Sequence, residues 1–133
     1  MQRQRRTYEQ PVAKRPLTER EQSMYLRLAQ ALPEHMVLAQ VSFSALLDAK
    51  TKAGRNRFNQ KTADFVICDK AFNVIAEVEL DDSSHNGKGP QDAQRDDMLK
   101  AAGYKVLRFK SVPTVAAIQS AQFSLNATHN PKG

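Results

Sequence analysis

Apolar residues recur at helical spacing near the start of the chain. Four of them between Met24 and Leu32 fall on one face of a helix, and Pro33 interrupts the pattern. Thr18 and Glu21 have the spacing of a capping box, in which the side chain of each residue accepts a hydrogen bond from the backbone N–H of the other. The sequence therefore predicts a helix that begins close to Thr18 and ends before Pro33.

Three apolar runs with partly alternating positions follow this helix. They cover residues 36–43, about 63–68 and about 73–80, and their β-branched and aromatic content is typical of strands. A short helical turn is expected over residues 45–47. The stretch 50–60 is polar and basic and contains a glycine, so it is predicted to be a loop.

The last third of the chain predicts a helix, a strand and a second helix. Good helix formers run over residues 91–102 until Gly103 supplies a C-terminal cap, and a strand is predicted over 104–110. A final helix is expected from about residue 114 to 123. Because a helical crossover places two strands parallel, the fourth strand should run parallel to a neighbour. The order predicts an α/β fold, with a mixed four-stranded sheet flanked by helices.

At 133 residues the chain is expected to form one domain. We expect a basic flexible arm over residues 1–16, the domain itself over 17–124 and a flexible tail over 125–133. No run approaches the roughly 18 apolar residues of a membrane helix, and the basic N-terminus lacks the apolar stretch of a secretory signal. A soluble, cytoplasmic protein without a membrane partner is therefore expected. The single cysteine excludes an internal disulfide.

Carboxylates gather in the second and third predicted strands. Glu77, Glu79 and Asp81 are two residues apart and therefore share one face of a strand. Acids this close repel one another unless a cation or base lies among them. A tight connection over residues 69–73 would pair the two strands antiparallel and bring Asp64 near Glu79. Such hard oxygen ligands suit Mg²⁺ or Mn²⁺.

Basic residues flank this acidic centre. The chain has 20 Lys+Arg against 14 Asp+Glu, a net charge of +6, and much of the excess lies in two blocks, one before the first helix and one before the second strand. This distribution is typical of proteins that hold a polyanion while binding a metal, although basic loops also serve solubility alone. The residues of the second block, predicted to bind nucleic acid, are Lys50, Lys52, Arg55, Arg57 and Lys61.

The acids belong to a longer ordered series of residues, which runs from about Leu17 to Phe109. Its members are Asp64-Phe65-Val66, Glu79-Leu80-Asp81, Ser84-His85, Asp92, Asp96, Leu99, Ala102-Gly103 and Leu107-Arg108. The series resembles the restriction-endonuclease-like superfamily of PD-(D/E)xK phosphodiesterases, whose core is an αβββαβ unit. Within it the chain is most similar to the Vsr-like branch and to an uncharacterised bacterial domain of unknown function.

The resemblance implies a metal-dependent nuclease that hydrolyses phosphodiester bonds in nucleic acid, with DNA as the expected substrate. Asp64 and Glu79 match metal ligands of the superfamily, and Asp81 stands where its E-x-K lysine normally positions the attacking water. In the resulting E-x-D site Asp81 ligates a second metal or acts as a base, or the site is inactive. Lys61 and Lys100 are the candidates to replace the missing cation.

Five further residues are expected near the site. His85 is a candidate proton carrier, because an imidazole titrates near neutral pH, and its alternative is an exposed bystander. Glu77 and Glu21 are expected to support the metal ligands, although the capping box also accounts for Glu21. Asp92 and Asp96 share a helix face, where they either face the site or hold the helix in place.

Two other functions remain open on the sequence. The missing lysine favours a catalytically inactive nucleic-acid-binding module of the same fold, and the third alternative is a protein-interaction domain. DNA and RNA are both open as ligands, and a homodimer is compatible with the resemblance.

Overall fold

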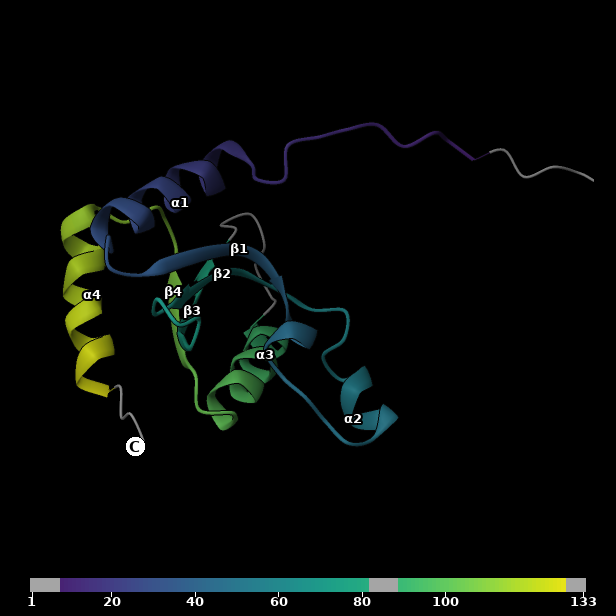
Figure 1. Cartoon of the computed structure of the whole chain (residues 1–133). Helices are drawn as coiled ribbons and strands as arrows, with labels where there is room; N and C mark the ends of the chain where they lie inside the picture. Colours follow the sequence, from purple (N-terminus) through teal and green to yellow (C-terminus); the bar gives the residue numbers. More distant parts are fainter. Residues whose placement is uncertain (1–7, 82–88, 129–133) are drawn as a thin grey trace, which may run out of the picture.

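The computed structural model describes residues 8–81 and 89–128, with side chains described for 8–81 and 93–121 (Figure 1). Its centre is a four-stranded sheet in the order β1-β2-β3-β4. The first three strands pair antiparallel and β4 runs parallel to β3. The strands are β1 (Met36–Ser42), β2 (Thr62–Cys68), β3 (Val74–Leu80) and β4 (Lys105–Phe109). The predicted mixed sheet and its αβββαβ order are confirmed.

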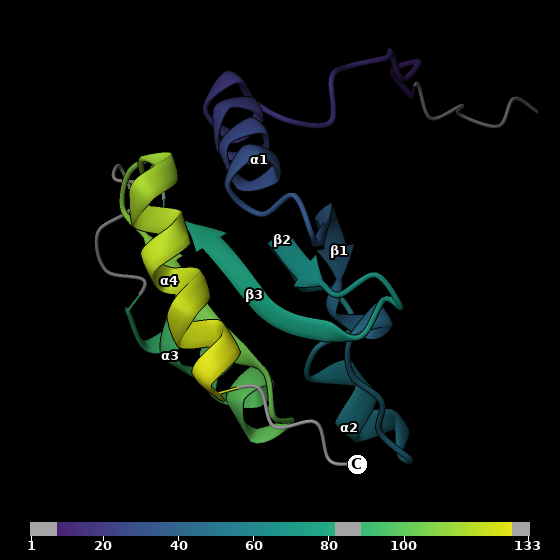
Figure 2. The same cartoon turned by 60° about the vertical axis from the view of Figure 1, so that its left-hand side comes forward.

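Helices cover both faces of this sheet. On one face α1 (Glu19–Ala31) and α4 (Val115–Thr128) lie against each other, and on the other face lies α3 (Gly89–Ala101), as Figures 1 and 2 show from two directions. The core under α1 and α4 takes Val78 and Leu80 from β3. Because alternate residues of a strand face opposite sides, the intervening Glu77 and Glu79 face α3.

The predicted first helix is confirmed in its bounds and its cap. The Thr18 hydroxyl accepts a hydrogen bond from the Glu21 N–H at 3.2 Å, and the Glu21 carboxylate accepts one from the Thr18 N–H at 2.8 Å. Met24 and Leu28 are buried, as the apolar period predicted. The capping box thus fixes where α1 begins, and with it the position of Glu21.

The β2–β3 connection is the predicted tight turn. The Asp69 N–H donates to the Asn73 carbonyl at 2.9 Å, and Asp69 Oδ1 accepts the N–H groups of Ala71 and Asn73, each at 2.9 Å. These bonds close the turn locally, so the antiparallel register of β2 and β3 follows from nearby residues.

The crossover from β3 to β4 runs through α3 and ends at Gly103. This glycine has φ 99°, a left-handed conformation that residues with a Cβ rarely adopt, and its N–H donates to the Lys100 carbonyl at 2.9 Å. The predicted cap is therefore confirmed, and β4 begins directly afterwards in parallel register with β3.

Three elements differ from the sequence prediction. The basic stretch 50–60, predicted to be a loop, contains α2 (Lys52–Asn56), because the Thr51 hydroxyl caps it by accepting the Gly54 N–H at 3.0 Å. The short helical turn is a 3₁₀ helix at Phe43–Ala45, slightly earlier than expected. The helix α4 continues to Thr128, because no glycine or proline stops it near residue 123.

The ends of the chain lie partly outside the described residues. Residues 8–16 of the predicted arm contain no helix or strand, while 1–7 and 129–133 are not described. Among the helices that the structure describes, none is both long and apolar enough to cross a membrane.

Candidate functional site

Asp64 and Glu79 lie side by side on neighbouring strands. Phe65 pairs with Val78 in the β2–β3 register, which sets Asp64 opposite Glu79. The Asp64 N–H donates to Glu79 Oε2 at 3.4 Å, and Asp64 Oδ2 accepts the N–H of Leu80 at 2.9 Å. The predicted proximity of the two carboxylates is confirmed, and each is tied to the backbone beside the other.

Burial makes this pair and the neighbouring Glu77 electrostatically unusual. Glu77 is 0% exposed and Glu79 is 4% exposed. Burial raises the pKa of Asp64 above its usual value, although the hydrogen bond from the Leu80 N–H and the charge of Arg95 oppose the rise. Burial likewise raises the pKa of Glu77 to about 8, against the opposing charge of Arg95. Glu77 is therefore mostly protonated at neutral pH.

The carboxylate of Glu77 is also unusual in its hydrogen bonding, because neither of its oxygens has a partner among the described residues. A buried polar group without a partner costs free energy, and the cost is greater for a charged group. Glu77 thus lies two residues from Glu79 on the same face of β3, as a group that resists ionisation.

Arg95 on α3 contacts this cluster directly. Its guanidinium donates to Glu79 Oε2 at 3.0 Å and also to the backbone carbonyl of Thr62. Its central carbon lies 5.3 Å from the centroid of the Phe43 ring, which is within the range of a cation–π contact. The buried Nε of Arg95 has no hydrogen-bond partner among the described residues. Arg95 is therefore fixed from three sides.

Arg108 on β4 joins two further acids at the same end of the sheet. It forms an ion pair with Asp81 and donates to Asp96 Oδ1 at 2.8 Å. Burial lowers the pKa of Arg108, but its hydrogen bonds to Asp96 and Asp81 outweigh that effect and raise the pKa above its usual range. The predicted ladder of acids on β3 is thus interleaved with two arginines.

Both arginines were missed as site residues in the sequence. Arg95 lies between Asp92 and Asp96 in the predicted helix, and Arg108 lies between Leu107 and Phe109 in the predicted fourth strand. An arginine between two apolar residues of a strand was the stronger signal, because burial of a guanidinium requires an acidic partner.

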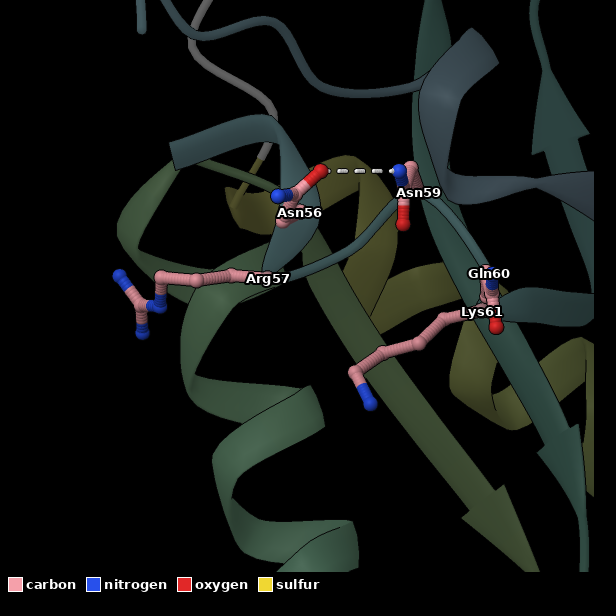
Figure 3. A pocket seen from close by; sticks show the side chains of 5 residues that line it. All are labelled: Asn56, Arg57, Asn59, Gln60 and Lys61. Atoms are coloured by element: carbon pink, nitrogen blue, oxygen red, sulfur yellow. Dashed lines mark hydrogen bonds between the residues drawn. The ribbon is translucent and has the colours of Figure 1, made fainter. Parts of the chain in front are cut away.

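The lysines proposed for the missing cation lie elsewhere. Within the described residues, neither Lys61 nor Lys100 forms an ion pair with Asp64, Glu79 or Asp81. Lys100 is exposed on α3, and Lys61 lines a hollow in the surface between α2 and β2 (Figure 3). In the part of the chain that the structure describes, Arg95 and Arg108 are the cations that contact these acids.

The other predicted supporting residues differ in their positions. Glu21 forms the capping box, and it is also close enough to Asp64 for its negative charge to raise the pKa of Asp64. Asp96 binds Arg108. His85 and the side chain of Asp92 lie outside the described residues, so their predicted roles stay predictions.

The basic block before β2 has structural as well as exposed members. Arg55 donates to the Ala49 carbonyl at 2.9 Å and so holds the loop before α2. Lys50 and Lys52 are exposed. Arg57 lines the same hollow as Lys61. The block thus presents several cations to solvent beside the strand that carries Asp64.

The carboxylates suit a magnesium-like ion only as a pair. Among the described residues, no group of three His, Cys, Asp or Glu side chains is arranged to hold a metal ion. Mg²⁺, however, is commonly bound by one or two carboxylates together with waters and phosphate oxygens of a substrate. Asp64 and Glu79 supply two adjacent carboxylates, and the raised pKa of Asp64 marks a site that a cation would stabilise. The donor set therefore fits such an ion.

Comparison with known proteins adds a family. The family described as "Protein of unknown function (DUF2726)" matches residues 13–123, which is most of the chain. No curated protein and no solved structure matches the chain.

Proposed function

Because the chain belongs to the DUF2726 family, whose function is unknown, we propose a function from its own charged cluster. The protein is a metal-dependent nuclease that hydrolyses phosphodiester bonds in nucleic acid, with DNA as the expected substrate. Its active site is a variant, E-x-D form of the restriction-endonuclease-like type. The αβββαβ order and the four-stranded mixed sheet support this proposal.

The observation that carries the proposal is the Asp64–Glu79 pair. Two carboxylates from different strands are held together at the end of a buried hairpin, and the backbone hydrogen bond of Asp64 runs to Glu79 itself. Such an arrangement costs stability through repulsion and burial, so a bound cation is a natural reason for it. Asp64 and Glu79 would hold Mg²⁺ or Mn²⁺, and Asp81 would join them as a ligand only when it is released from Arg108. When bound, the ion would polarise the scissile phosphate and activate water.

The arginines take the part of the missing lysine. Arg95 donates to Glu79, so it orients that carboxylate and places a fixed positive charge beside the proposed phosphate position. Arg108 holds Asp81 at the same end of the sheet. Glu77, protonated at neutral pH, adds no further negative charge there. The chain thereby limits the repulsion that a phosphate would meet.

Isothermal titration with Mn²⁺ and Mg²⁺ tests the proposal on the wild type, Asp64→Asn and Glu79→Gln. The same samples are then assayed for cleavage of single-stranded, duplex, mismatched and branched DNA and of RNA. Both neutral isosteres should lose metal binding and cleavage together, because each removes one ligand charge. Asp97→Asn, which changes an exposed acid of α3, is the matched control and should keep both. A folded wild type that binds metal but cuts none of these substrates would refute the nuclease.

A second function, a nucleic-acid-binding module without catalysis, is favoured by a different observation. Glu79 pairs with Arg95, and Asp81 and Asp96 share Arg108, so two arginines offset most of the charge of these three acids without a metal. Such a module should bind DNA with a steep salt dependence and show no heat of Mn²⁺ binding. The titration therefore separates the two functions.

A further inference from the structure

A polar hollow opens in the surface between α2 and β2. It is lined by Asn56, Arg57, Asn59, Gln60 and Lys61 (Figure 3). The Asn59 amide donates to Asn56 Oδ1 at 3.3 Å, and Figure 3 shows the side chains of Arg57 and Lys61 extending toward the same side of the loop. The hollow therefore combines two cations with three side-chain amides.

The two cations of the hollow have no side-chain partner in the described part of the chain. Within the described residues, the side chains of Arg57 and Lys61 form no hydrogen bond or ion pair. Arg55, only two residues away from Arg57, does hold the loop through the Ala49 carbonyl. Arg57 and Lys61 are thus available to bind an anion without any cost to the fold.

The hollow connects directly to the carboxylate pair. The Lys61 carbonyl accepts the N–H of Phe43 at 2.9 Å, and the next residue, Thr62, accepts a hydrogen bond from Arg95, which binds Glu79. Asp64 is three positions after Lys61, which corresponds to about 10 Å of extended chain. This length is similar to the rise of about three nucleotides along one strand of B-DNA.

We propose that this hollow binds a backbone phosphate of the nucleic acid, a few nucleotides away from the bond held at Asp64 and Glu79. Arg57 would bind the phosphate with its planar fork and Lys61 with a compact charge, while the amides add hydrogen bonds to phosphate or sugar. That the phosphate belongs to a nucleic acid rests on the function proposed above. Of the five basic residues predicted to bind nucleic acid, the proposal selects Arg57 and Lys61 as the two that position the bound nucleic-acid strand.

Fluorescence anisotropy with a labelled 20-base-pair DNA duplex, in buffer without divalent metal, tests the hollow between 50 and 200 mM salt. The double variant Arg57→Gln/Lys61→Gln should weaken binding and reduce the salt slope by about 0.9, since the loss of one phosphate contact lowers the slope by about that amount. Lys70→Gln/Lys110→Gln makes the same change in net charge at exposed positions outside the hollow and should alter the slope far less.

Lys50→Gln/Lys52→Gln provides the sharper comparison within the same loop. Equal losses in this variant and in the hollow variant would mean a diffuse basic surface and overturn the proposal, as would a wild type that binds no duplex. Far-UV circular dichroism confirms that each variant is folded. Because this assay involves no cleavage, the two proposals fail separately: binding through the hollow without cleavage refutes only the nuclease, and cleavage without the hollow effect refutes only the hollow.

Discussion

The guanidinium of Arg95 donates to the carboxylate of Glu79 at 3.0 Å and thereby joins α3 to the centre of the sheet. The Glu79 side chain is 5% exposed and that of Arg95 is 23% exposed. If either residue were replaced, the charge of the other would therefore be left unpaired and poorly solvated. The contact therefore ties the stability of the domain to the electrostatics of the proposed active site.

Removing this partner should destabilise the protein strongly. We expect Arg95→Gln to lower the free energy of unfolding by about 3 kcal/mol, because it leaves Glu79 buried and unpaired. The control is Lys70→Gln, which breaks the exposed Lys70–Glu34 pair at 3.8 Å and should cost less than about 0.5 kcal/mol. Urea unfolding at pH 7 measures both. Equal decreases in the free energy of unfolding of the two variants would show that the Arg95–Glu79 contact stabilises the protein no more than an exposed ion pair does.

Glu77 should make the protein less stable as the pH rises. Burial raises its pKa in the folded state from the ordinary 4.5 to about 8, so between these values the folded chain binds a proton that the unfolded chain has released. Stability from this group is complete below about pH 4.5 and is lost progressively as the pH rises toward 8. The slope is at most about 1.4 kcal/mol per pH unit.

The variant Glu77→Gln isolates that dependence, because glutamine resembles the protonated acid and does not titrate. Its stability relative to the wild type should increase from pH 5 to pH 8, as measured by urea unfolding at a series of pH values. Asp97→Asn changes an exposed acid and should follow the wild type throughout. A constant difference between Glu77→Gln and the wild type across this range would contradict the raised pKa.

Glu21 has two roles that substitutions can separate. Glu21→Gln should preserve the capping box, since glutamine also accepts the Thr18 N–H, and it should lower the pKa of Asp64 by removing a negative charge. Glu21→Ala should in addition cost about 1 kcal/mol of stability. Carboxyl NMR titration reports the pKa of Asp64. Glu19→Gln removes a charge from the same helical turn outside the box, and an equal effect there would mean that Glu21 has no specific influence.

Arg108 tests whether Asp81 belongs to the metal ligands. If it does, Arg108 competes with the metal for this carboxylate, and Arg108→Gln should raise the affinity for Mn²⁺ about tenfold, which corresponds to one charge-assisted hydrogen bond. Arg108→Lys keeps a competing charge and should change the affinity less. Isothermal titration on the folded variants gives the answer. Unchanged affinity in Arg108→Gln would remove Asp81 from the set.

The Asp64–Glu79 pair could be predicted because its determinants are local. Alternating residues placed the acids on one strand face, and the turn at Asp69 fixed the register of the two strands. Sequence spacing alone was therefore sufficient to predict that the two carboxylates lie close together.

The partners of the acids could not be predicted in the same way. Which cation contacts Glu79 depends on how α3 docks on the sheet, and nothing local distinguishes Arg95 from Lys61 or Lys100 in that respect. Likewise, alternation placed Glu77 on the acidic face, but its burial without a hydrogen bond depends on the same docking. The family match to a domain of unknown function is confirmed. The nuclease-type relationship stays a proposal.

The local turn between β2 and β3 also has a consequence for the order in which the chain folds. A hairpin closes faster than a crossover, so Asp64 and Glu79 should meet before α3 and β4 deliver Arg95 and Arg108. The early hairpin would then carry unneutralised acids. We expect refolding at pH 8, followed by stopped flow, to accelerate when Mg²⁺ is added. Ions in the surrounding solution would thus act on this protein before its native structure exists.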